Sequence, residues 1–199
     1  VKGSIYCGGI AGDNAGTIEN CTVDGSSQII GADYGKTVSG AYSIGGIVGD
    51  NTGTITNCTN YASVSALKSA GQQKPGNGIG GIAGMCHEAQ KTISGCVNYG
   101  EISAPDYSQV GGIAGRINPK ITLEDCRNEA PVTGGARTGG IAGAISTESA
   151  VSGCTNAGNV SGAEDVGGIV GYTDTMKQGS RVGSSTVQDC INLGSVSGE

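Results

Sequence analysis

A short glycine-rich motif recurs along this chain and constrains its fold more than any other feature. The string Gly-Gly-Ile-(Ala/Val)-Gly occurs six times, at intervals of 28 to 37 residues. Its copies begin at Gly8, Gly45, Gly80, Gly111, Gly139 and Gly167. Repetition at a period of about 20–50 residues is the sequence signature of repeat architectures. We therefore expect residues 1–199 to form a single array of stacked repeats.

A second block follows each copy of the motif. It contains an aliphatic residue, a cysteine three positions later and, in five of the six copies, an asparagine two positions after the cysteine. The cysteines are Cys21, Cys58, Cys96, Cys126, Cys154 and Cys190. The asparagines are Asn60, Asn98, Asn128, Asn156 and Asn192, and Val23 takes this place in the first copy. This constant order of blocks indicates that each repeat is one structural unit.

Each repeat contains three short stretches of β-forming residues, separated by turns rich in Gly, Asn, Ser and Asp. In one repeat they are Val110–Gly115, Ile121–Cys126 and Pro131–Thr133. We predict an all-β fold, a parallel β-helix (β-solenoid) of about six coils with three short strands per coil. Neighbouring coils would stack about 4.8 Å apart, and the rule for parallel crossovers favours a right-handed coil.

Equivalent positions of such a stack lie on top of one another, so its core consists of ladders of like residues. We expect one isoleucine ladder, each member contributing about 1.5–3 kcal/mol of burial. Its members are Ile10, Ile47, Ile82, Ile113, Ile141 and Ile169. The paired glycines predict a corner that needs either positive φ or close backbone approach. The asparagines predict side-chain hydrogen bonds along the axis.

The repeated blocks run from Gly8 to Ser197 and resemble the GLUG-motif repeats of bacterial surface and secreted proteins. Some of those proteins also carry IgA-protease-like metallopeptidase domains. The resemblance implies a passive or adhesive segment, extracellular or on the bacterial cell surface. Lys2-Gly3-Ser4-Ile5 is similar to Leu193-Gly194-Ser195-Val196, so we expect an uncapped fragment with further repeats of the same chain stacked at both ends.

Charge and composition exclude two classes of partner. The formal net charge is −6 at pH 7, and the chain contains neither Phe nor Trp. A nucleic-acid-binding protein needs a basic face and stacking aromatic residues, which this chain lacks. Its apolar runs are also much shorter than the roughly 20 residues of a transmembrane helix. We expect no nucleic-acid partner and no membrane insertion.

Residues that could support catalysis are few. His87 is the only histidine, and Lys91 stands where a zincin has the second histidine of its motif. Asp13-Asn14 and Asp50-Asn51 align in neighbouring repeats, which is typical of a turn, with calcium binding as the alternative. We therefore predict no enzyme activity, no catalytic residue, no metal and no cofactor.

The repeated cysteines are interpreted as buried free thiols that act as small apolar side chains. Disulfides between adjacent coils remain an alternative, although in-register stacking holds the Cβ atoms farther apart than the preferred distance of about 3.8 Å. A zinc site near Cys86 and His87 is a further alternative. Cys86 is expected to lie in a turn as the most exposed thiol of the chain.

Two insertions, Gly31–Ser43 and Leu67–Gly78, interrupt the same corner in successive repeats and should protrude side by side. A third, Tyr172–Ser185, occupies a different corner. Loops on a rigid scaffold often carry binding residues, with solvated spacers as the alternative. The candidate ligand-binding residues are Tyr34, Lys36, Tyr42, Lys68, Gln72, Gln73 and Lys74.

We therefore predict a non-enzymatic structural and adhesive repeat module of a large extracellular bacterial protein. It would act as a spacer that binds a glycan or a host or matrix protein through its inserted loops. The alternative is a fragment of a carbohydrate-active or other β-helix enzyme. Carboxylates stacked across three successive repeats would favour the enzyme, and the repeated positions of this chain contain no such stack.

Overall fold

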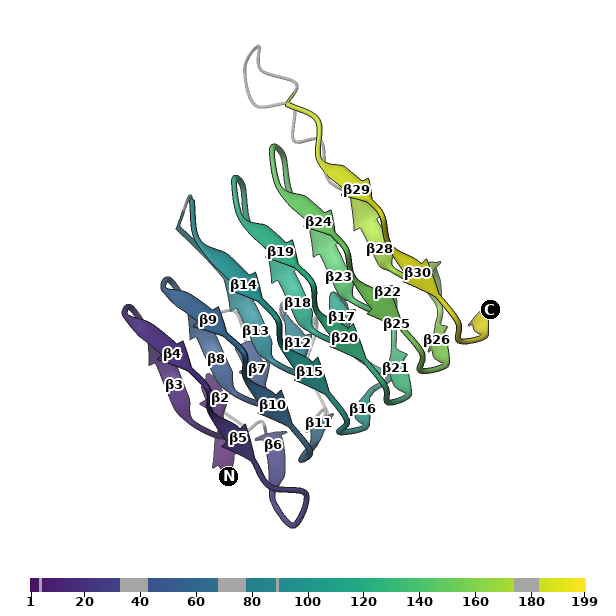
Figure 1. Cartoon of the computed structure of the whole chain (residues 1–199). Coiled ribbons are helices and arrows are strands. Elements are labelled where there is room, and N and C mark those ends of the chain that lie inside the picture. Colours follow the sequence, from purple (N-terminus) through teal and green to yellow (C-terminus); the bar gives the residue numbers. More distant parts are fainter. Residues whose placement is uncertain (4, 33–42, 68–77, 89, 174–182) are drawn as a thin grey trace.

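The computed structural model describes residues 1–3, 5–32, 43–67, 78–88, 90–173 and 183–199. These residues form an all-β parallel β-helix, and none of them is helical (Figure 1). Successive coils, numbered here by their glycine motif, lie side by side in the same order in every sheet. The fold class predicted from the repeats is confirmed.

Two sheets, one on each side of the glycine motif, contain six strands each. Sheet 1 contains β2 (Tyr6–Gly8), β7 (Ser43–Gly45), β12 (Ile79–Gly80), β17 (Val110–Gly111), β22 (Ala136–Gly139) and β27 (Glu164–Gly167). Sheet 2 contains β3 (Ala11–Asn14), β8 (Val48–Asn51), β13 (Ala83–Cys86), β18 (Ala114–Ile117), β23 (Ala142–Ile145) and β28 (Val170–Thr173).

Three further sheets complete each coil. Sheet 3 contains β4 (Thr17–Glu19), β9 (Thr54–Thr56), β14 (Thr92–Ser94), β19 (Thr122–Glu124), β24 (Ala150–Ser152) and β29 (Thr186–Gln188). Sheet 4 contains β5 (Thr22–Val23), β10 (Thr59–Asn60), β15 (Val97–Asn98), β20 (Arg127–Asn128), β25 (Thr155–Asn156) and β30 (Ile191–Asn192). Sheet 5 contains β1 (Lys2–Gly3), β6 (Gln28–Ala32), β11 (Ser63–Leu67), β16 (Ile102–Ala104), β21 (Val132–Gly134), β26 (Val160–Gly162) and β31 (Val196–Gly198).

The structure has five short strands per coil where the sequence predicted three. The predicted strand Val110–Gly115 is divided into β17 and β18 by the bend at the glycine motif. A second bend separates sheets 3 and 4. It arises because the residue before each repeated cysteine has a left-handed backbone conformation, as in Asn57 (φ 52°), Gly95 (φ 61°) and Asp125 (φ 52°). Asn, Asp and Gly tolerate this conformation better than other residues, which explains their recurrence at this position.

The isoleucine ladder forms the core as expected. Ile47, Ile82, Ile113 and Ile141 are fully buried, whereas Ile10 in the first coil is 45% exposed. Ile10 has a neighbouring coil of this chain on one side only, which accounts for its exposure. Burial of each inner isoleucine therefore depends on the coils on both sides.

The asparagines of sheet 4 form a continuous ladder of side-chain hydrogen bonds. Asn60 Nδ2 donates to Asn98 Oδ1 at 2.8 Å, and Asn98 Nδ2 donates to Asn128 Oδ1 at 2.8 Å. The second glycine of each motif lies against this ladder: a Cβ at Gly81 would lie 2.3 Å from Asn98 Cγ, and one at Gly46 would lie 2.4 Å from Asn60 Cγ. Since none of the paired glycines has positive φ, close approach explains their presence.

Replacing a central ladder amide tests this arrangement. We expect Asn98→Val to lower the free energy of unfolding by about 1–3 kcal/mol, because it leaves buried polar groups of Asn60 and Asn128 without their partner. Valine already takes the equivalent place in the first coil, where Val23 lies against Gly9, so its size is compatible with the fold. Urea unfolding followed by circular dichroism gives the measurement.

The matched control is Asn192→Val in the exposed last strand of sheet 4. There the loss removes the bond that Asn192 accepts from Asn156 and the bond that it donates to Gly194 O, at an exposed position where water can replace both. An equal loss of stability in both variants would contradict a buried, cooperative ladder.

Candidate functional site

All seven predicted ligand-binding residues, Tyr34, Lys36, Tyr42, Lys68, Gln72, Gln73 and Lys74, lie outside the described residues. The strands that flank both insertions are described, and they are in register. Ala32 at the end of β6 lies opposite Leu67 at the end of β11, and Ile44 in β7 lies opposite Ile79 in β12. The two insertions therefore leave and rejoin the solenoid at neighbouring points. The third insertion lies between sheets 2 and 3, at a different corner.

A chain of polar contacts crosses coils two, three and four beside sheet 2. His87, which follows β13, has its Nε2 atom 2.9 Å from Asp50 Oδ1 in β8. Its Nδ1 atom lies 2.7 Å from Asn118 Nδ2, and Arg116 Nε donates to Asn118 Oδ1 at 2.9 Å. The register of sheet 2 places Asp50, Met85 and Arg116 at equivalent positions of successive coils. The contact between His87 and Asp50 was not predicted from the sequence, which gave His87 no role.

The contacts of His87 raise its pKa above the ordinary value of a histidine. The side chain of Asp50 raises the pKa of His87, while partial burial and the charge of Arg116 act in the opposite direction. Because Asn118 uses its amide oxygen for Arg116, its NH₂ group faces Nδ1, which assigns the hydrogen of neutral His87 to Nε2. Both ring nitrogens are then engaged, so the imidazole has no free nitrogen with which to activate a nucleophile.

The raised pKa of His87 makes stability depend on pH. A group whose pKa is higher in the folded state stabilises the fold fully below its unfolded pKa of about 6.5, and this contribution is lost as the pH rises through the folded value. We expect His87→Gln to lower the melting temperature more at about pH 5.5 than at about pH 8.5. In an Asp50→Asn background, this pH dependence should disappear. A constant difference across the range would contradict the contact.

The ladder cysteines are free and lie against sheets 3 and 4. Cys58, Cys96, Cys126 and Cys154 are buried, as is Cys7 in sheet 1. Each ladder thiol donates to the carbonyl two residues before it, for example Cys126 Sγ to Glu124 O at 3.2 Å. Burial raises the pKa of Cys58 to about 11, so its thiolate is scarce at neutral pH. The expectation of buried free thiols is confirmed for these four inner ladder cysteines, whereas Cys21 and Cys190 at the two ends of the ladder are partly exposed.

The prediction that Cys86 is the most exposed thiol is wrong. Cys86 belongs to β13, is fully buried and has its pKa raised by that burial. The sequence was misleading because His87 and Glu88 follow directly and are typical of a turn, whereas the turn begins only after the strand residue Cys86. The partly exposed thiols are instead Cys21 and Cys190, in the two outer coils.

Thiol labelling tests this burial. In the native protein, a maleimide should modify Cys21 and Cys190 and leave the other six cysteines unmodified, because the reactive thiolate needs both exposure and deprotonation. All eight should react after denaturation. Peptide mass spectrometry identifies the labelled sites. Native modification of Cys86, or incomplete labelling after denaturation without reductant, would contradict the free, buried state.

An exposed pair of stacked tyrosines went unrecognised in the sequence. Tyr61 and Tyr99 directly follow the ladder asparagines of two neighbouring coils, and their rings stack with centroids 4.9 Å apart and planes 6° apart. Each is 47% exposed. The signal available in the sequence was the repeated pair Asn-Tyr at Asn60 and Asn98. Each ring covers one face of the other.

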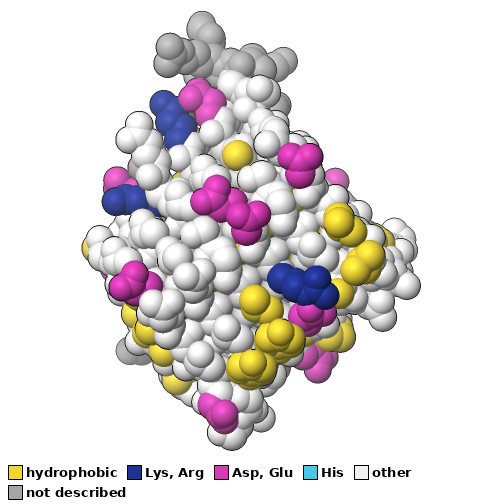
Figure 2. Space-filling model, in the orientation of Figure 1, with side chains coloured by type: hydrophobic (Ala, Val, Ile, Leu, Met, Phe, Trp, Pro, Cys, Tyr) yellow, Lys and Arg dark blue, Asp and Glu magenta, His cyan; other side chains and the backbone are white. Residues whose placement is uncertain are grey.

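Figure 2 shows the face formed by sheets 3 and 4, where acidic side chains are scattered and hydrophobic side chains gather toward the lower edge. The exposed hydrophobic residues of sheet 4 and its following turns are Tyr61, Tyr99, Ile191 and Leu193. Arg127 on the same sheet forms an ion pair with Glu129. This face therefore combines a few apolar side chains, scattered acidic side chains and one Arg–Glu ion pair.

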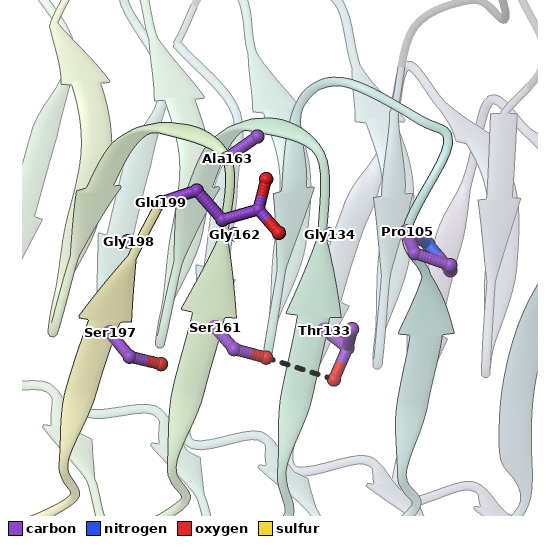
Figure 3. Close-up of a pocket in the computed structure, with 9 residues that line it drawn as sticks. All are labelled: Pro105, Thr133, Gly134, Ser161, Gly162, Ala163, Ser197, Gly198 and Glu199. Atoms are coloured by element: carbon purple, nitrogen blue, oxygen red, sulfur yellow. Dashed lines mark hydrogen bonds between the residues drawn. The ribbon is translucent and has the colours of Figure 1, made fainter.

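A shallow pocket of about 390 Å³ lies on the outside of sheet 5 near the last coils (Figure 3). Its lining residues are Pro105, Thr133, Gly134, Ser161, Gly162, Ala163, Ser197, Gly198 and Glu199. Thr133, Ser161 and Ser197 point to the same side from neighbouring strands, and the hydroxyls of Thr133 and Ser161 are 3.2 Å apart. With Glu199 as its single ionisable side chain, the pocket contains no acid–base pair.

The aligned Asp-Asn pairs end strands β3 and β8, and their asparagine side chains bond to the turns that follow. Asn14 Oδ1 accepts from Gly16 N at 3.1 Å, and Asn14 Nδ2 donates to Asn51 Oδ1 at 2.7 Å. The asparagines thus close the turns between sheets 2 and 3. Within the described ranges, no group of three or more His, Cys, Asp or Glu residues is arranged to hold a metal ion.

No family model matches the sequence, and no curated protein or solved structure shows significant similarity to it. In the part of the chain that the structure describes, no helix is long and apolar enough to cross a membrane.

Proposed function

We propose that this chain is a non-enzymatic structural and adhesive repeat module of a large extracellular bacterial protein. The observation that carries the proposal is the in-register stacking of all five sheets from the first coil to the last. Such a stack holds its two ends and its surface loops at fixed positions relative to one another. A segment of this kind serves as a spacer that presents binding residues.

The ends of the stack support this role. The outermost strands β1 and β31 each have a neighbour in sheet 5 on one side only. An unpaired strand edge is a template for further pairing, so each end of the stack offers a surface on which another parallel strand can pair. The resemblance to GLUG-motif repeats supports placement outside the cell or on the bacterial surface.

The adhesive part of the proposal rests on the two insertions at one corner. Their flanking strands are adjacent, so residues 33–42 and 68–77 start from a shared point of the scaffold. Tyrosine offers amphipathic contact area, and the amides and lysines of these segments offer hydrogen bonds. We assign them a glycan or a host or matrix protein as partner. The β-helix enzyme is less favoured, since both nitrogens of His87 are engaged.

Binding to a glycan and matrix-protein array tests the proposal. The intact chain is compared with a variant in which residues 33–42 and 68–77 are shortened to the length of the 28-residue coil. We expect the variant to lose binding and keep its melting temperature, because the shortest natural coils already close without these residues. The matched control shortens residues 174–182 at the other corner and should bind normally.

Retained binding after both insertions are shortened would place the site elsewhere. Absence of binding by the intact chain would reject the adhesive role and leave the spacer role. Hydrolysis or cleavage of any arrayed ligand by the intact chain would support the β-helix enzyme instead.

A further inference from the structure

A line of six residues borders the outside of sheet 4, with one member from each coil. Backbone hydrogen bonds set its register: Tyr61 N donates to Val23 O, and Tyr99 N donates to Asn60 O. The members are Asp24, Tyr61, Tyr99, Glu129, Ala157 and Leu193. The ring centroids of Tyr61 and Tyr99 are 4.9 Å apart, close to the spacing of about 4.8 Å between coils. The two rings therefore stack along the line.

Stacking uses one face of the Tyr61 ring, and the opposite face is turned toward the first coil. Within the described ranges, Tyr61 has a ring contact with Tyr99 only. The first coil contributes Asp24 and Gly25 at this point, and a Cβ at Gly25 would lie 3.5 Å from Tyr61 Cβ. Glycine has no side chain with which to cover the ring, and Asp24 is exposed. An aromatic face and a carboxylate are thus accessible side by side.

The fourth coil pairs a carboxylate beside the rings with a guanidinium. Glu129 follows Tyr99 in the line, and its carboxylate forms an ion pair with Arg127. The register of sheet 4 places Thr22 of the first coil at the position of Arg127. Asp24 therefore has a threonine where Glu129 has an arginine. Among the described residues, no basic side chain lies within ion-pair distance of Asp24.

The surface around the tyrosines is acidic. Each coil crosses it from the start of its sheet 3 strand to its member of the line, and these segments together contain six carboxylates and one basic residue. The carboxylates are Glu19, Asp24, Glu124, Asp125, Glu129 and Asp189. The basic residue is Arg127, which is already paired. Acidic side chains are spread over this face in Figure 2. Because complementary charge steers and selects partners, the face favours a basic one.

We propose that Tyr61, Tyr99 and Asp24 form a docking surface for an arginine-containing basic segment of a partner protein. A guanidinium is planar and stacks on the face of an aromatic ring, and it pairs with a carboxylate through two parallel N–H···O bonds. A guanidinium stacked on the open side of Tyr61 meets Asp24 as Arg127 meets Glu129. The surface lies on sheet 4, away from the insertions between sheets 5 and 1, so this inference goes beyond the adhesive role assigned to them.

Two matched pairs of variants of the full chain test the docking surface. Tyr61→Leu introduces the residue found at the equivalent position of the last coil, Leu193. Its control is Tyr6→Leu, because Tyr6 on sheet 1 is also 47% exposed. Asp24→Asn keeps a side-chain oxygen for the bond that closes its turn. Its control, Asp13→Asn, removes the same charge from an exposed position of sheet 2 in the same coil.

The probes are oligoarginine and oligolysine peptides of equal length, with linear neutral oligosaccharides as the other class of ligand. Affinity is measured by calorimetry at physiological ionic strength, because salt screens the general attraction between a basic peptide and an acidic chain. Proton NMR of the complex reports on stacking, since the ring current of a tyrosine shifts the side-chain protons of a stacked arginine upfield.

We expect the parent chain to bind oligoarginine more tightly than oligolysine. Tyr61→Leu should weaken oligoarginine binding by about fivefold, as for loss of a cation–π contact, and should remove the upfield shift. Asp24→Asn should weaken it by about threefold, as for loss of an exposed ion pair. Tyr6→Leu and Asp13→Asn should bind as the parent does. All four variants should melt within a few degrees of the parent, because all four positions are exposed.

Unchanged oligoarginine affinity in Tyr61→Leu would overturn the docking surface. Equal binding of oligoarginine and oligolysine would also overturn it, since charge alone would then account for both. Loss of oligosaccharide binding in Tyr61→Leu, without oligoarginine binding by the parent, would assign the surface to a sugar instead. Self-association that Tyr61→Leu abolishes would assign it to a second copy of this chain.

The variant with both insertions shortened separates this surface from the adhesive role. It should bind oligoarginine as the parent does, whether or not it still binds the arrayed ligands. Loss of oligoarginine binding in that variant would place the basic partner on the insertions and overturn the docking surface on sheet 4.

Discussion

Parallel strands spaced by about 4.8 Å require each coil to match the cross-section of the coils beside it, and the rest of this structure depends on that match. A side chain that fits one level must fit against its own equivalent at the next. Isoleucine, cysteine and asparagine satisfy this requirement at their positions in most coils. Large aromatic rings do not recur in this way: Tyr107 is buried at a single level, and the stacked tyrosines Tyr61 and Tyr99 are exposed.

The glycine motif and the asparagine ladder are two parts of one packing arrangement. The amide of Asn98 occupies the space that a side chain at residue 81 would need. The same amide bonds to the coils on both sides. Glycine at the corner therefore serves the ladder, and the ladder ties the corner to its neighbours. This coupling explains why a glycine and an asparagine 14 to 24 positions apart recur together in the repeats.

The architecture could be predicted from the sequence because residues that recur at equivalent positions of the repeats stack on one another in the fold. The isoleucine ladder, the free thiols and the asparagine ladder could all be predicted from spacing alone. The division of each coil into five strands could not be predicted in this way. It depends on residues with a left-handed backbone conformation, such as Asn57, and that conformation is set by the local turn. The burial of Cys86 was also missed, because a strand end and a turn have similar sequences.

The candidate site was harder to predict because its members occupy different coils without repeating. Asp50, His87 and Arg116 interrupt the pattern of their own positions, so periodicity gives no reason to group them. Only the register, together with the turn after β13, brings His87 to both Asp50 and Asn118. The predicted ligand-binding residues of the two insertions lie outside the described structure. The structure shows only that the strands before and after the two insertions are neighbours.

The asparagine ladder has a direction, since each Nδ2 donates to the Oδ1 of the following coil. Its amide dipoles are therefore aligned along the axis, and each bond polarises the next. Val23 lies opposite Asn60 but has no amide with which to join this series. Coils two to six are thus joined by a continuous series of side-chain amide bonds in sheet 4, and the first coil is not part of this series. Under tension along the axis, the junction between coils one and two therefore relies on a different side-chain amide bond from every later junction, the one from Asn14 to Asn51 beside sheet 2.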